Sequence, residues 1–171
     1  MPKLQINREE FLNMLRDGIS LKDINLSNMN LSKISMPGID LSHANLRGAD
    51  LSRANLKGAN LEGANLENAV MTRANLSIAN LKDANLRCAN LVSANLSGAA
   101  TTSVQSTARV IGANLHRANL AKAKLNNANL VRAKLSWADF RGANFDGADL
   151  TRALLQGAKY DIDAFDKAIS V

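Results

Sequence analysis

The 171-residue chain has few of the residues that form disulfides and metal sites, since it contains one cysteine and two histidines. Prolines are scarce too, at two. A lone Cys88 excludes an intramolecular disulfide and a cysteine-rich metal site. The N-terminal stretch MPKLQINREEF lacks the apolar h-region of a secretory signal. No apolar run approaches the roughly 18 residues that a transmembrane helix needs. We therefore expect a cytoplasmic protein in a reducing compartment, with no membrane contact and no cofactor.

Aromatic residues are scarce as well, at 4% of the chain, although 46% of the chain is hydrophobic. A buried core must therefore be built mainly from leucine and alanine. Lysine and arginine together number 21 against 15 acidic residues, which gives a formal net charge of +6. This excess permits contact with an acidic partner but does not by itself establish one.

A repeat of five residues is the dominant pattern of the chain, as in the stretch ANLRGADLSRANLKGANLEGANL at residues 44–66. We call the central apolar residue position i. From Leu21 to Leu96 position i recurs every five residues and is leucine except at Met36 and Met71. Position i−2 is Ile or Met at first and alanine from Ala44 onward, position i−1 is mostly Asn or Asp, and positions i+1 and i+2 carry most charges.

A period of five fits neither a helix nor a flat strand. Five helical steps of about 100° leave successive leucines about 140° apart, and an odd step along a strand reverses the side chain. If each repeat is a short extended segment followed by a turn, positions i and i−2 point to the same side. A turn of about 90° would close four repeats into one 20-residue coil, with coils about 4.8 Å apart. The spacing alone does not establish that four repeats close a coil. The expected core includes Leu46, Leu51, Leu56, Leu61 and Leu66, with Ala49, Ala54, Ala59 and Ala64.

The pattern breaks once, in the stretch TTSVQSTARV at residues 101–110, and a second array follows from Leu115 to Phe165. The distance from Thr101 to Leu115 is not a multiple of five, so the phase slips. One residue could be lost from a continuous coil, a loop could bulge out, or the break could be a seam between two arrays. We divide the chain into a capping helix (1–18), a first array (19–100), the break (101–112), and a second array with the C-terminal end (113–171).

A short helix is predicted before the first array, in the stretch NREEFLNMLRDG. Asn7 is the expected N-cap, with Glu10 completing a capping box, and Gly18 is the expected stop. Because the first coil of a solenoid is exposed unless something covers it, we expect this helix to act as a lid.

The repeats ANLRG at 44–48, ADLSR at 49–53 and ANLKG at 54–58 resemble the pentapeptide-repeat proteins, many of which come from cyanobacteria. The resemblance implies an all-β fold, a right-handed quadrilateral parallel β-helix with positions i and i−2 inward. Some members of the family inhibit DNA gyrase by imitating the acidic surface of duplex DNA. The positive balance of this chain disfavours that role.

Stacking residues 20 apart produces one basic column at position i+2, made of Lys33, Arg53 and Arg73. If the break is a one-residue deletion, Arg132 and Arg152 return to the same face. Like charges stacked about 5 Å apart repel one another, so binding of an anionic partner such as nucleic acid is one interpretation of the column. Solvated side chains that splay apart are the alternative interpretation.

Trp137 is the other outward feature, at position i+2 and one coil after Arg117. An exposed Trp beside an Arg is one form that a protein-binding hot spot takes. Alternatively, the indole covers a local apolar gap or makes a cation–π contact. His43, His116 and Cys88 also lie at outward positions, without metal-ligand spacing.

No set of residues with catalytic or metal-ligating spacing stands out, so an enzyme is not expected. The leading prediction is a structural repeat protein that serves as a protein-interaction scaffold for an unknown partner. The alternatives are a DNA-mimicking gyrase inhibitor and a protein that binds an anionic partner through the basic column.

Overall fold

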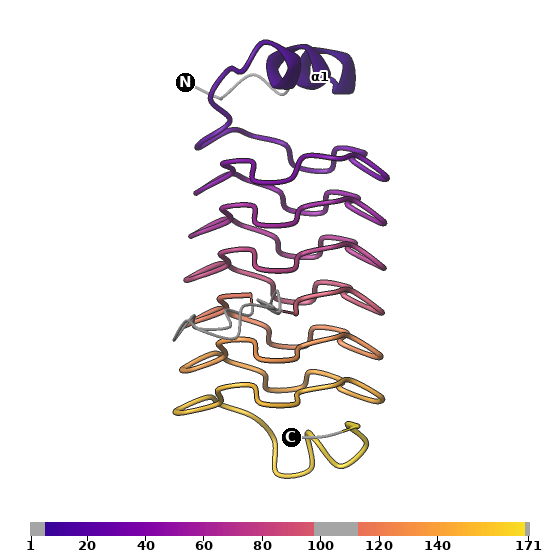
Figure 1. Ribbon diagram of the computed structural model, residues 1–171, viewed down its shortest axis with the longest axis vertical. Helices are drawn as coiled ribbons and strands as arrows, with labels where there is room; N and C mark the ends of the chain where they lie inside the picture. The colour runs from indigo at the N-terminus through magenta and orange to yellow at the C-terminus, as the bar shows by residue number, and fades with distance from the viewer. Residues whose placement is uncertain (1–5, 98–112, 170–171) are drawn as a thin grey trace, which may run out of the picture.

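The protein is a rod of stacked coils with a helix at its N-terminal end (Figure 1). The computed structural model describes residues 6–97 and 113–169. The predicted break at 101–112 and the first five residues lie outside these ranges. Within them, helix α1 (Arg8–Arg16) is the one regular element, and the coils are held together by isolated parallel β-bridges rather than by longer strands.

Helix α1 begins and ends at residues whose side chains and backbone favour a helix boundary. Asn7 accepts a hydrogen bond from the backbone N–H of Glu10 at 2.9 Å, and the Glu10 carboxylate accepts one from the Asn7 N–H at 2.8 Å. Gly18 adopts a φ of 67°, and the N–H of Ile19 donates to the Met14 carbonyl at 3.0 Å. This is the Schellman arrangement, which glycine favours because it has no Cβ.

The helix covers the first coil through both apolar and polar contacts. Phe11 is fully buried and belongs to the same hydrophobic cluster as the coil leucines. The Arg8 guanidinium donates to the backbone carbonyls of Asn30 and Ser32 in that coil. These contacts exclude water from the end of the core, which is the role expected of a lid.

Four repeats close each coil, because every bridge in the first array joins residues 20 apart. The bridges fall into four columns, one for each of four consecutive repeats, and the fifth repeat returns to the first column. Each coil therefore has four sides. The bridges join Asn25 to Asn45, Asn30 to Asp50, Ser35 to Asn55, and Asp40 to Asn60, and the same columns continue below.

The backbone hydrogen bonds explain the period of five. The N–H of Leu56 at position i donates to Asn75 in the next coil at 2.8 Å, and the N–H of Gly58 donates to Ser77 at 2.9 Å. A turn then closes when the N–H of Ala59 donates to the Leu56 carbonyl at 3.0 Å. The side chain of the Asn at i−1 accepts the N–H of residue i+1, as Asn55 does for Lys57 at 3.3 Å. Each repeat therefore contributes one extended segment and one turn.

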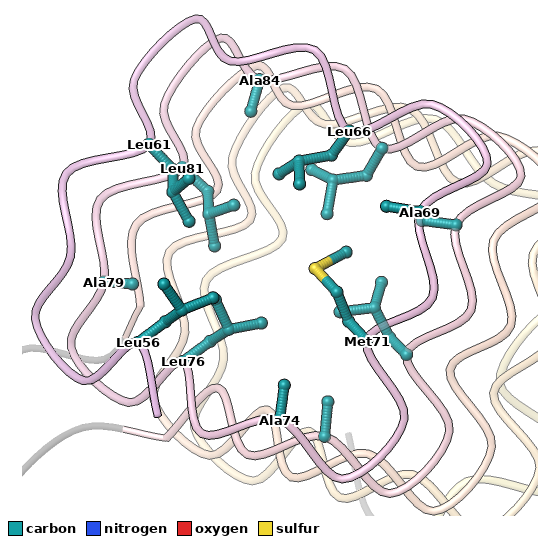
Figure 2. Close-up of a cluster of buried hydrophobic side chains, with 14 of the residues drawn as sticks. Leu56, Leu61, Leu66, Ala69, Met71, Ala74, Leu76, Ala79, Leu81 and Ala84 are labelled. Carbon is teal, nitrogen blue, oxygen red and sulfur yellow. The ribbon is translucent and has the colours of Figure 1, made fainter. Parts of the chain in front are cut away.

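The core consists of leucine and alanine layers that point toward the rod axis (Figure 2). Met71 lies in one such layer beside Leu56, Leu66 and Ala74, and the side chains come from all four sides. The nine residues that the sequence places in the core are at most 1% exposed: Leu46, Ala49, Leu51, Ala54, Leu56, Ala59, Leu61, Ala64 and Leu66.

The bridge offset changes between the two described ranges, 6–97 and 113–169. Asn80 bridges to Asn114, which is 34 residues later instead of 20. The N–H of Ala113 donates to the Leu96 carbonyl at 3.2 Å, which is the turn bond that Ala94 makes with Leu91. Ala113 therefore takes the position that follows Leu96 in the coil. A one-residue deletion would give an offset of 19, so the offset of 34 contradicts it. The predicted break itself lies outside the described residues.

Regular bridging ends at Lys159, one repeat before the predicted end at Phe165. The reason lies at Asp161, whose carboxylate accepts the N–H of Gly142 where earlier coils use a backbone carbonyl. Residues 162–167 then form turns. Phe165 packs on Phe145 with ring centroids 4.8 Å apart and on Tyr160 at 4.9 Å, so aromatic rings close this end. Tyr160 stays half-exposed instead of pointing fully inward.

Candidate functional site

Because the interior is filled with side chains, any functional surface must be built from the outward positions i−1, i+1 and i+2. Some outward charges are paired between coils. Glu67 lies 3.1 Å from Arg87 and 3.6 Å from Arg47, one coil on either side. Glu62 accepts a hydrogen bond from Lys82 at 2.9 Å, which lowers the pKa of the Glu62 carboxyl and raises the pKa of Lys82. These pairs stabilise neighbouring coils only weakly, because both partners are exposed.

The expected basic column of Lys33, Arg53 and Arg73 forms one corner of successive coils. The N–H of Lys33 donates to Ser52 at 2.9 Å and that of Arg53 donates to Thr72 at 2.9 Å, so the three residues are stacked directly. None of the three forms an ion pair within residues 6–97 and 113–169.

Arg132 and Arg152 do not join this column. Lys134 and Leu154 belong to the bridge column that contains Asn80 and Asn114. Arg132 and Arg152 lie two residues before Lys134 and Leu154, at the corner that precedes this column. The two arginines therefore continue the corner of Ile78, and the column below Arg73 holds Ser93, Asn127 and Gly147 instead. The expected placement assumed an offset of 19 across the break, and the offset of 34 moves both arginines to the next corner of the coil.

Trp137 and Arg117 do share one corner in consecutive coils, as the spacing of 20 predicts. The N–H of Arg117 donates to Ser136 at 3.0 Å, and the N–H of Trp137 donates to Gln156 at 2.9 Å. Arg117 is held from the other side by Asp83, at 3.3 Å. The indole is 60% exposed.

The indole of Trp137 lies flat on Gly157. A Cβ added at Gly157 would be 2.8 Å from both Cδ2 and Cε3 of the ring and 3.0 Å from Cε2, so it would meet the ring face. This contact matches the interpretation of an indole that covers a local gap, and glycine is the residue that leaves room for it. A shallow hollow beside the ring is lined by His116, Arg117, Trp137, Gly157 and Lys159.

Metal-ligating side chains are dispersed in the part of the chain that the structure describes. There, no three His, Cys, Asp or Glu side chains gather as a metal site would require. Every buried side-chain nitrogen or oxygen in these ranges has a hydrogen-bond partner. No helix in residues 6–97 and 113–169 is long and apolar enough to cross a membrane.

The repeats match the family described as "Pentapeptide repeats" in eight copies, over residues 19–58, 49–87, 72–99, 108–136 and 133–159. The matched segments cover well over half of the chain. This chain belongs to the pentapeptide-repeat family. No match is found among curated proteins.

Solved structures of the same family resemble this pentapeptide-repeat protein. HetL, a protein involved in heterocyst differentiation regulation from the cyanobacterium Nostoc sp. strain PCC 7120, is 29% identical, with 97% of this chain and 98% of HetL covered and a TM-score of 0.39. A pentapeptide-repeat protein of the Arabidopsis thaliana thylakoid lumen is 27% identical, with 77% and 71% covered and a TM-score of 0.37. QnrB1, a plasmid-mediated fluoroquinolone resistance protein, is 21% identical, with 84% and 92% covered and a TM-score of 0.38. The family assignment rests on the repeat match and not on these superpositions.

Sequence reasoning missed two residues beside Trp137, namely Gly157 and Lys159, and one cation on the same side of the coil, Lys134. Gly157 and Lys159 follow Trp137 by 20 and 22 residues, so stacking by 20 would have placed them there. Lys134 was missed for another reason. Sequence reasoning places Arg132 and Arg152 on the face of Lys33, so Lys134 has no cationic neighbours there. The offset of 34 between Asn80 and Asn114 is what places the two arginines on the side that contains Lys134.

Proposed function

We propose that this pentapeptide-repeat protein is a non-enzymatic, cytoplasmic interaction scaffold, a right-handed quadrilateral β-helix whose outward side chains bind a protein partner. The supporting observation is that different positions of each repeat form the core, the bridges and turns, and the outer surface. Side chains at positions i and i−2 are buried in the core, and residues at position i−1 form the bridges and support the turns. Positions i+1 and i+2 are left free to vary, on a backbone held rigidly by hydrogen bonds between coils.

The test is affinity capture followed by binding of the purified candidate. Wild-type protein is compared with Trp137→Ala, which removes the largest exposed side chain, and with Asn28→Ala, a matched outward change at another corner. A partner that binds wild type and Asn28→Ala but loses affinity for Trp137→Ala supports the proposal, because hot-spot aromatics carry much of an interface's energy. Repeated capture without any partner that binds in purified form contradicts it.

A second candidate function is binding of an anionic partner through the column of Lys33, Arg53 and Arg73. The three cations stack without an acidic partner in the described ranges, which leaves their charge available. Arg53→Glu and Arg73→Glu should weaken binding and reduce its salt dependence, whereas Arg87→Glu, whose native side chain pairs with Glu67, serves as the control. Unchanged binding in the first two variants would eliminate this candidate.

Gyrase inhibition by DNA mimicry ranks lower, because the outward surface carries a positive excess where an imitation of DNA needs a continuous negative one. A supercoiling assay with and without the protein measures this directly, and clear inhibition would reverse the ranking.

A further inference from the structure

One side of the solenoid, between two neighbouring corners, gathers cations around the exposed tryptophan. We call it the cationic face and define it by Arg117, Arg132, Lys134, Trp137 and Arg152. We propose that the cationic face binds single-stranded nucleic acid, with a base stacked on the Trp137 indole and phosphates held by the neighbouring cations. This goes beyond the scaffold function, and it concerns a different corner from the Lys33 column.

The bridge register places these residues together. Asn114, Lys134 and Leu154 follow one another along the middle of the face. Arg132 precedes Lys134 by two residues and lies directly above Arg152, because the Arg132 N–H donates to Thr151 at 2.9 Å. Trp137 follows Lys134 by three residues, at the neighbouring corner that ends this side, and lies one coil below Arg117. Arg117 therefore lies one coil above the indole, and the other three cations lie along the same side of the solenoid.

Among the described residues, one of the four cations of this face, Arg117, is paired with an acidic residue, and the other three are not. Residues 113–137 contain five Lys and Arg and no Asp or Glu. Of the acidic groups nearest in sequence and register, Asp83 pairs with Arg117, and Asp139 pairs with Arg141 on the next side at 2.6 Å. Asp149, three residues before Arg152, accepts hydrogen bonds from the N–H and hydroxyl of Thr151 at 2.9 and 2.5 Å. Arg132, Lys134 and Arg152 form no ion pair in the part of the chain that the structure describes. A surface of this kind attracts a polyanion and releases its counterions on binding.

The orientation of the indole distinguishes a nucleic acid from an acidic protein. A tryptophan that anchors a protein interface usually fills a pocket on the partner. Here one ring face rests on Gly157, so the ring lies flat and presents its other face to solvent. A flat exposed ring beside cations is the stacking platform of single-strand-binding proteins. In a duplex the base faces are already stacked on one another, so the single strand is the form that fits.

The test uses Trp137 itself, since it is the one tryptophan of the chain and intrinsic fluorescence therefore reports this site alone. The probes are an oligothymidine of about 20 residues, long enough to exceed a single-strand site of roughly 4–16 residues, a duplex of equal length, and polyglutamate. Oligothymidine should quench the fluorescence, with affinity that falls steeply as salt increases. The duplex and polyglutamate should quench far less, because neither offers a free base face.

Labelled oligothymidine, followed by anisotropy, allows variants without tryptophan to be compared. Trp137→Ala should weaken binding by roughly 5- to 150-fold, the range for loss of one stacking contact. The triple variant Arg132→Glu, Lys134→Glu, Arg152→Glu should abolish binding. The matched control, Lys22→Glu, Lys57→Glu, Arg87→Glu, makes the same change of charge at exposed positions outside both the cationic face and the Lys33 column, and it should retain most of the affinity. Circular dichroism confirms that each variant is folded.

Three outcomes would overturn the proposal. These are no binding of oligothymidine at low salt, equal fluorescence quenching by polyglutamate, which would indicate an acidic protein instead, and an equal loss of affinity in the matched control.

Discussion

Replacement of Leu61 by alanine tests the physical basis of the fold at a single layer. Leu61 is fully buried, so the change removes about three buried carbon groups, each worth about 0.8 kcal/mol. A cavity then remains, because neighbouring coils hold their places through backbone hydrogen bonds, and it adds about 24 cal/mol per Å³. Together the loss should be about 2–5 kcal/mol in the free energy of unfolding.

Leu154→Ala is the matched control, since it is the same chemical change at position i−1, where the side chain is 56% exposed. It should cost less than about 1 kcal/mol. Equilibrium unfolding in guanidinium, followed by circular dichroism, gives both values. Hydrogen exchange complements it because the coils of a solenoid contact mainly their neighbours and cooperativity can break down. Equal losses for the two variants, or a neutral Leu61→Ala, would refute the layered core.

Four other changes have expected outcomes. Ala64→Leu should overpack the corner and cost about 1–3 kcal/mol in equilibrium unfolding, and a neutral result would show unfilled space there. Asn7→Ala should cost about 0.5–2 kcal/mol by removing the N-cap of helix α1, seen as faster amide exchange in the first coil. Hydrogen bonds from Arg141 lower the pKa of Asp139 below its usual 3.8, so this carboxylate stabilises the fold at neutral pH and the contribution is lost as pH falls below about 4. Asp139→Asn should therefore make stability less dependent on pH in the acid range, and an unchanged pH profile would argue against that pair. Gly157→Ala should shift the Trp137 emission, whereas Gly38→Ala, at the same φ of 69° but with nothing within 4 Å, should not.

The sequence predicts the period, the inward positions and the N-terminal helix because each depends on local chemistry. The spacing of leucine and alanine requires a turn in every repeat, and the capping box of Asn7 and Glu10 marks a helix start within four residues. The sequence does not predict the number of repeats in a coil, since the five-residue pattern is compatible with any regular turn. The bridges between residues 20 apart supply that number.

The register across the break could not be predicted for a related reason. Every repeat offers nearly the same leucine and alanine, so the core is satisfied equally well whichever corner follows Leu96. The phase slip before Leu115 agrees with a lost residue and with an insertion. The choice moves Arg132 and Arg152 from one corner to the next, and therefore decides whether they share a face with Lys33 or with Trp137. At the C-terminal end the Asp161 side chain competes with the backbone pattern, which repeat counting cannot detect.

The register across residues 98–112 is the central claim, because the cationic face depends on it. Cysteines at positions 85 and 119, in a chain where Cys88 is replaced by serine, test it directly. These positions bridge in the structure and lie close enough for a disulfide, whose Cα atoms are about 4.4–6.8 Å apart. The control pair, at positions 65 and 85, lies in the uninterrupted array. Mass spectrometry of unreduced peptides should find both disulfides. A disulfide in the control pair but none between positions 85 and 119 would contradict the register and the cationic face built on it.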